Sequence, residues 1–100
     1  MQMSQRQIEI LKIIIEEYID SAQPIGSEML DRKHNLGVSP ATIRNEMVQL
    51  VRMGYLNKPH VSAGRVPTPQ AFRYYISQLM REIELSVAEE VSVKQRMWDV

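Results

Sequence analysis

The 100-residue sequence predicts a mainly α-helical domain with one small β-hairpin. Three observations indicate this fold class. Apolar residues recur at helical spacing along most of the chain, a hydroxyl residue precedes proline where two helical stretches begin, and one short β-rich segment lies between Gly and Pro. With 44% hydrophobic and 24% charged residues, the chain can form one core of ordinary size.

The first helix is expected over residues 5–22. Ser4 and Gln7 have the spacing of a capping box, which satisfies free backbone N–H groups at a helix start. Glu16 and Glu17 are adjacent in sequence and are interpreted as solvated surface. The apolar face of this helix is predicted to consist of Ile8, Leu11, Ile15, Tyr18, Ile19 and Ala22.

A short second helix is expected over residues 27–34. Pro24 disfavours helix in the residue before it, and Gly26 relaxes the backbone, so the first helix ends before them. Ser27 is the predicted N-cap of the second helix. Residues 35–38 then form a tight turn that sets the next helix at an angle.

The third helix is expected over residues 40–53. Ser39 at the N-cap and Pro40 at the first helical position are the strongest start signal in the chain. Gly54 lies where a C-terminal glycine cap belongs. The apolar stripe of this helix consists of Ile43, Met47, Leu50 and Val51.

A hairpin is expected over residues 55–67. Residues 55–58 have the composition of a short strand, and residues 60–64 form a flexible tip. Residues 65–66 are the return strand, and Pro67 is expected to stop it because proline cannot donate a hydrogen bond.

The last helix is expected from Pro69 to a boundary between about residues 86 and 97, with Thr68 as its cap. Residues 72–79 are expected to pack on the first helix. Beyond Met80, packing on that helix and pairing with a second copy of the chain are equally open. The apolar residues of the last helix are Phe72, Ile76, Leu79, Ile83, Val87 and Val91.

Positive charge is concentrated in residues 32–81. This segment holds eight Lys and Arg against one acid, Glu46, so it carries a net charge of +7 while the whole chain is neutral. Such a concentration of cations is what a nucleic-acid-binding surface requires, because neutralised phosphates release counterions. Taken alone, the same charges are explained equally well as solvated side chains on a helical surface.

The order of these elements is that of a winged helix-turn-helix, whose second paired helix enters the major groove. On helix 40–53, the residues away from the apolar stripe are small, polar or cationic, which suits contact with base edges and phosphates. Ser39 alternatively serves only as a cap, and Arg44 and Asn45 as ordinary solvent-facing residues. The candidate DNA-binding residues here are Ser39, Ala41, Thr42, Arg44, Asn45 and Gln49.

The hairpin corresponds to the wing, which reaches along the DNA backbone or minor groove. Arg65 alternatively protects an exposed strand edge, and Gly64 is more readily a turn residue than a contact residue. For His60, phosphate contact and plain solvent exposure are equally supported. The candidate wing residues are Lys58, His60, Ser62, Gly64 and Arg65.

Enzyme, cofactor and metal sites are not expected. The chain has no Cys and only two His, and it lacks a His-x-x-x-His pair, a Gly-x-Ser-x-Gly elbow and a Gly-rich phosphate loop. Its longest uninterrupted apolar run is three residues, so no membrane span or export signal is expected. A cytoplasmic location is therefore the default expectation.

The stretches NLGVSPATIRNEM (residues 35–47) and PHVSAGRVPT (residues 59–68) closely resemble the N-terminal domain of the HrcA family of bacterial heat-inducible transcription repressors. Further matching stretches at residues 5–11 and 73–75 extend the resemblance over roughly residues 4–80. It implies a dimeric repressor that binds an inverted-repeat operator, the CIRCE element, upstream of chaperone genes. It also implies that repressor activity depends on the chaperonin.

The resemblance places Ser39, Thr42, Arg44 and Asn45 in the recognition-helix motif and His60, Ser62, Gly64 and Arg65 in the wing motif. Family members carry a much longer C-terminal part, so the chain is expected to be a fragment of such a repressor or a short relative. Residues 1–80 are therefore the expected DNA-binding domain. Residues 81–100 are a C-terminal helical extension, or the start of a linker to a regulatory part.

The alternative function is a protein-interaction module that has the winged-helix shape without binding DNA, since fold does not fix function. Val48 on the outer face of helix 40–53 supports this alternative, as does the apolar pair Met97-Trp98.

Overall fold

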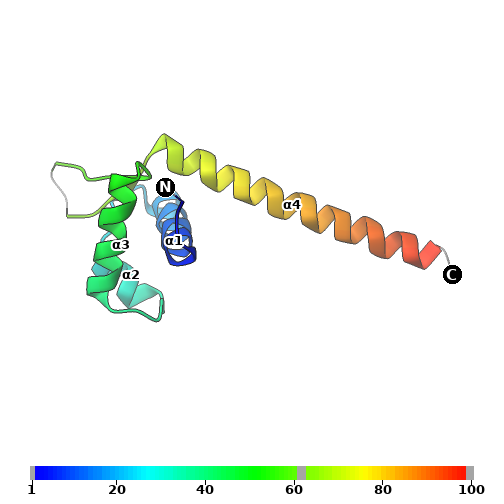
Figure 1. Cartoon of the computed structure of the whole chain (residues 1–100), viewed down its shortest axis with the longest axis horizontal. Coiled ribbons are helices and arrows are strands. Elements are labelled where there is room, and N and C mark those ends of the chain that lie inside the picture. Colours follow the sequence, from blue (N-terminus) through cyan, green and yellow to red (C-terminus); the bar gives the residue numbers. More distant parts are fainter. Residues whose placement is uncertain (1, 61–62, 99–100) are drawn as a thin grey trace.

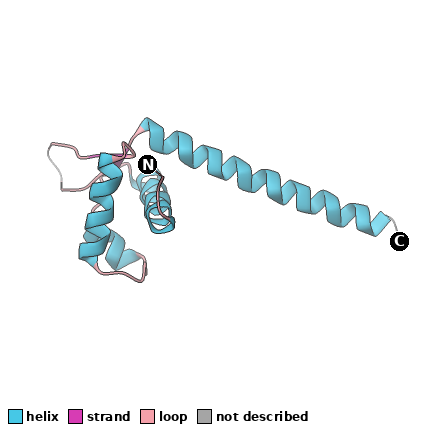
Figure 2. Ribbon diagram, viewed as in Figure 1, coloured by secondary structure: helices cyan, strands magenta, loops and turns pink. Residues whose placement is uncertain are grey.

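The structure is a computed structural model that describes residues 2–60 and 63–98. It confirms the expected fold class of helices with one small hairpin (Figures 1 and 2). In chain order the elements are α1 (Gln5–Ser21), α2 (Ser27–Lys33), α3 (Pro40–Arg52), β1 (Leu56–Asn57), β2 (Val66–Pro67) and α4 (Pro69–Trp98).

The first three helices gather around one core, and α4 projects away from them (Figure 1). The radius of gyration is 17.1 Å, larger than the roughly 13 Å of a compact 100-residue chain. The longest dimension, 61 Å, is about twice each of the others, 29 and 27 Å. The elongated shape follows from α4, most of which lies outside the core.

The core is formed by one face each of α1 and α3, with single residues from the other elements. On α1 the buried side chains are shifted from the expected face, because Ile19 is 58% exposed and Ala22 is exposed. On α3 the expected stripe is confirmed, with Val51 half-buried. The buried hydrophobic residues are Ile10, Leu11, Ile14, Ile15, Ile25, Leu30, Ile43, Met47, Leu50, Leu56 and Ala71.

The start of α2 differs from the prediction. Gly26 is the N-cap, and Ser27 is the first helical residue, so Ser27 does not cap this helix. The reason is a long-range contact: Ile25 and Arg65 exchange two backbone hydrogen bonds, each 2.8 Å long. This antiparallel bridge holds the residue before Gly26 in an extended conformation, and α2 starts as soon as the bridge ends.

The ends of α3 agree with the predicted signals. The Ser39 hydroxyl accepts a hydrogen bond from the backbone N–H of Thr42 at 3.2 Å. The helix ends at Arg52, one residue before the expected end, with Met53 as its C-cap. Gly54 follows with φ +87°, the left-handed conformation that favours glycine.

The hairpin is shorter than expected, and Pro67 belongs to it. Leu56 pairs with Pro67 and Asn57 with Val66 in antiparallel register. Proline is tolerated because a two-stranded sheet consists of edge strands, where a missing N–H removes no further ladder bond. Thr68 then joins the hairpin to α4: its hydroxyl donates to the Gly54 carbonyl at 2.7 Å and accepts from the Ala71 N–H at 3.2 Å.

Helix α4 continues to Trp98, past the expected boundary, because β-branched residues lower helix propensity by only tenths of a kcal/mol each (roughly 0.5). Only its first turns pack on the domain, where Phe72 contacts Tyr18 with ring centroids 6.3 Å apart. The expectation that residues 72–79 pack on α1 is therefore wrong for Ile76, which is 53% exposed, and for Leu79, which is 44% exposed. Ile76 lies on the side of α4 away from the core, whereas Leu79 lines a cavity of about 300 Å³ beside Ile8 and Leu11 of α1.

Glu17 is buried, with only 8% of its surface exposed, which corrects its interpretation as solvated surface. Its carboxylate accepts a hydrogen bond from Lys33 Nζ at 2.9 Å and lies 2.8 Å from His34 Nε2. The hydrogen bond from Lys33, followed by that with His34, holds the pKa of Glu17 below its usual value of 4.5, although desolvation acts in the opposite direction. The cluster ties α1 to the residue where the turn toward α3 begins.

We expect Glu17→Gln to destabilise the fold in a pH-dependent way. The folded-state pKa of Glu17 is lowered, so its stabilising contribution is complete above the usual value of 4.5, which applies to the unfolded chain, and is lost as the pH falls through the folded value. Urea-unfolding midpoints should therefore differ between parent and variant at about pH 7 and converge at an acidic pH below the folded-state pKa of Glu17. An equal difference at both pH values would contradict the assignment.

Candidate nucleic-acid interface

Helix α3 presents its small and polar residues to solvent at the end that follows the turn. Ala41, Arg44 and Asn45 are exposed, whereas Thr42 and Gln49 are half-buried. Thr42 is held by the cap, since its hydroxyl lies 3.0 Å from that of Ser39. The exposed face of the helix is therefore available to a partner from Ala41 to Asn45, one turn in length.

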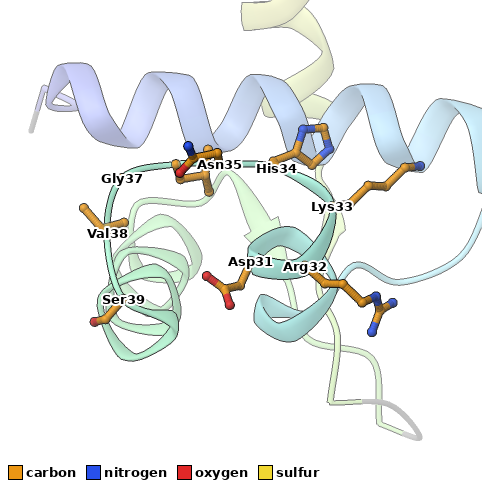
Figure 3. Close-up of a pocket in the computed structure, with 9 residues that line it drawn as sticks. Asp31, Arg32, Lys33, His34, Asn35, Gly37, Val38 and Ser39 are labelled. Atoms are coloured by element: carbon orange, nitrogen blue, oxygen red, sulfur yellow. The ribbon is translucent and has the colours of Figure 1, made fainter.

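The turn between α2 and α3 encloses a shallow pocket of about 640 Å³, lined by residues 31–39 (Figure 3). Lys33 and His34 point toward α1, in agreement with their contacts to Glu17 (Figure 3). Lys33 is thus engaged within the fold. It contributes less to a free cationic surface than its sequence position indicated.

The wing residues differ from one another in exposure. Lys58 and His60 are exposed, Arg65 is half-buried, and Gly64 is buried. Nη1 of Arg65 donates hydrogen bonds to the carbonyls of Ala63, at 2.6 Å, and Gly64, at 3.3 Å. The remaining wing candidate, Ser62, lies outside the described residues.

Close packing, rather than backbone freedom, accounts for glycine at position 64. Positive φ values among the described glycines occur at Gly37 and Gly54 and not at Gly64. A Cβ added to Gly64 would lie 2.8 Å from Pro24 Cβ and 3.0 Å from the backbone N of Ile25. The wing therefore rests directly on the α1–α2 connection.

A cavity of about 380 Å³ lies between α3, the wing and the start of α2. Three cationic residues from different elements line it: Arg44 from α3, Lys58 from the segment after β1, and Arg65 from the residue before β2. Ser27 and Glu28 line it on the α2 side. The structure thus brings together one recognition-helix candidate and two wing candidates.

Sequence reasoning missed the α2 side of this cavity. Local spacing predicts a cap at Ser27 and no role for Glu28, because the contact that brings α2 to the wing joins Ile25 to Arg65, forty positions apart in the chain. The available signal was a single β-branched residue, Ile25, between the helix breakers Pro24 and Gly26.

Residues 2–81 match the family model described as "Winged helix-turn-helix transcription repressor, HrcA DNA-binding". The chain belongs to this family. The match covers the three core helices, the hairpin and the first turns of α4. Within the described parts of the chain, no helix is long and apolar enough to cross a membrane.

Full-length relatives carry the name heat-inducible transcription repressor HrcA. The protein of Desulforamulus reducens is 51% identical over 94% of this chain, and that of Acetivibrio thermocellus is 50% identical over 95%. The chain spans about a quarter of the length of these curated relatives, 27% in both cases.

A solved structure supports the fold as well. A crystal structure of a hypothetical protein superposes with a TM-score of 0.76 at 38% sequence identity. The match covers 80% of this chain and 25% of the crystallised one.

We expect Gly64→Ala to destabilise the domain by about 1–3 kcal/mol, because the new methyl group meets the backbone of the α1–α2 connection. Gly26→Ala is the matched control, since a Cβ at Gly26 meets nothing within 4 Å and the loss should stay below about 1 kcal/mol. Chemical denaturation followed by circular dichroism measures both. Equal losses of stability in the two variants would show that the close packing of position 64 on Pro24 does not require glycine.

Proposed function

We propose that the chain is the sequence-specific DNA-binding module of a transcriptional repressor, with α3 in the major groove and the hairpin on the adjacent backbone. The observation that carries this proposal is the exposed face from Ala41 to Asn45, which is free of bulky apolar side chains and lies beside a cationic wing. A small residue at Ala41 permits close approach to base edges, and the Asn45 amide can pair with adenine through two hydrogen bonds. The family match supports this role.

The proposed target is an inverted-repeat operator similar to CIRCE, read by two copies of the module. Helix-turn-helix proteins bind such sites as two-fold dimers, with one recognition helix in each half-site. The name of the relatives, heat-inducible transcription repressor, supports a role in the heat-shock response. The resemblance alone suggests chaperonin as a regulator of the full-length protein. A repressor of this kind acts in the cytoplasm, without enzymatic activity or a cofactor.

We expect Asn45→Ala to reduce discrimination by about 1–3 kcal/mol at one base pair of each half-site, because it removes both amide hydrogen bonds. Gln95→Ala is the control, since Gln95 also carries an exposed amide but lies on α4, away from α3 and the wing. Fluorescence anisotropy with a CIRCE-type duplex and its single-base variants measures the change. If Asn45→Ala retained the parent's discrimination at every position, α3 would not be the reading helix.

The competing function is a protein-interaction module without DNA binding. Val48, one of its supports, is half-buried on α3, and the side chains of Met97 and Trp98 lie outside what the structure describes. A gel shift with unrelated duplex at low salt separates the two functions. Non-specific retardation is expected of a DNA-binding module, because phosphate contacts are independent of sequence.

We further propose that residues 1–80 form the DNA-binding domain and that residues 81–100 extend it toward a partner copy. Exposed apolar side chains form one stripe along α4, on the side turned away from Ala71 and Tyr74, which contact the core. Most helical stability in proteins comes from the packing of an apolar face, so pairing along this stripe would stabilise the exposed turns of α4. The stripe consists of Ile76, Leu79, Met80, Ile83, Val87 and Val91.

We expect Ile83→Ser to weaken self-association and raise the dimer Kd by about tenfold or more, because each copy loses one buried apolar side chain worth about 1.5–3 kcal/mol. Leu85→Ser is the control, since Leu85 is 62% exposed but lies on another side of α4. Sedimentation equilibrium over a concentration series measures both. If the two substitutions changed the dimer Kd equally, the apolar stripe that contains Ile83 would not be the dimer interface.

A further inference from the structure

The cavity between α3, the wing and α2 combines three positive charges with one negative charge. Arg44, Lys58 and Arg65 come from three separate segments, and Glu28 faces them from the first turn of α2. The residues that line the cavity therefore carry a net charge of +2 around a space of about 380 Å³. Like charges brought together in this way repel one another, which favours an anion between them.

Arg65 is partly engaged within the wing through Nη1, whereas the other polar side chains on the cationic side of this cavity are available to a ligand. Within residues 2–60 and 63–98, the Arg44 and Lys58 side chains and the Ser27 hydroxyl make no hydrogen bond, and neither cation has an acid within 4.0 Å. Nε of Arg65 is buried and has no hydrogen-bond partner among these residues. Glu28, although close, therefore does not neutralise the cluster through an ion pair.

We propose that this cavity binds a single phosphate group of the DNA backbone, shared by Arg44, Lys58 and Arg65. The inference rests on the proposed function and refines it. The Ile25–Arg65 bridge fixes the wing against α2, so the spacing of the three cations is set before any ligand arrives. Planar guanidinium groups and a flexible ammonium together suit the oxygens of one phosphate.

This assignment changes the role of Arg44. Arg44 lines the cavity, whereas Asn45, the next residue, lies about 100° further around α3 on the exposed face. A side chain bound to a shared phosphate is not free to read guanine. Arg44 then positions the helix on the backbone, and base discrimination is left to its neighbours.

The decisive experiment compares salt dependence in the parent and in the double variant Arg44→Gln/Lys58→Gln, both at exposed positions. The slope of log K against log salt changes by about 0.9 for each phosphate neutralised. One shared phosphate predicts a slope smaller by no more than about 0.9, whereas two separate phosphates predict about 1.8. The control, Arg81→Gln/Arg96→Gln, removes the same charge from exposed positions of α4 and should leave the slope unchanged.

Two single variants test the chemistry of the cavity. Arg44→Gln should weaken binding to all duplexes by the same factor, and Glu28→Gln should tighten it, because the carboxylate repels the phosphate. A loss of discrimination at one base pair in Arg44→Gln, or unchanged binding in Glu28→Gln, would overturn the proposal. Either result leaves the proposed function intact, since that function fails if the parent binds no duplex or binds all duplexes equally.

The source of the phosphate is tested through the Arg65 side-chain Nε–H signal in nitrogen-15 NMR spectra. The parent is titrated with duplex DNA, and separately with inorganic phosphate against chloride at equal ionic strength. A shift with duplex alone indicates a site that requires the backbone diester, and a saturable shift with both indicates one that also takes the free anion. Both support the phosphate site, and a signal that neither ligand shifts overturns it.

Discussion

The antiparallel bridge between Ile25 and Arg65 is the contact on which the arrangement of the binding surface depends. It consists of two 2.8 Å backbone hydrogen bonds, and Gly64 lies beside it against Pro24, with no space for a side chain. The bridge sets where α2 starts and how close the wing lies to α3. Because Arg65 is both a partner in the bridge and a lining residue of the cationic cavity, the same contact builds the fold and the site.

The end of the hairpin next to α4 is also held by hydrogen bonds. Thr68 bonds to the carbonyl of Gly54 and to the first turn of α4, so one hydroxyl closes the hairpin and caps the following helix. On the opposite side of the domain, Glu17 holds Lys33 and His34 at the end of α2. Helix α3 is thus positioned from both ends, at the turn before it and at the hairpin after it.

Local signals in the sequence predicted the elements well. The Ser39-Pro40 and Thr68-Pro69 starts and the Gly54 end act within one helical turn, so they can be recognised without knowing the tertiary structure. The misplaced features depend on distant partners. Burial of Glu17 requires Lys33, and displacement of the cap from Ser27 to Gly26 requires Arg65, neither of which local spacing identifies.

The same limit applies to the site. The exposed face of α3 could be predicted because helical periodicity assigns sides, whereas the cavity could not, because its walls come from three segments.

Helix α4 has a mechanical consequence. Its 30 residues form a rod of about 45 Å, and Thr68 alone separates the rod from strand β2 of the wing. A lateral force on the C-terminal turns of α4 is therefore transmitted along the helix to Thr68 and the base of the hairpin. A partner bound to the distal turns of this rod therefore acts on the base of the hairpin from about 45 Å away, while the Ile25–Arg65 bridge holds the wing in place.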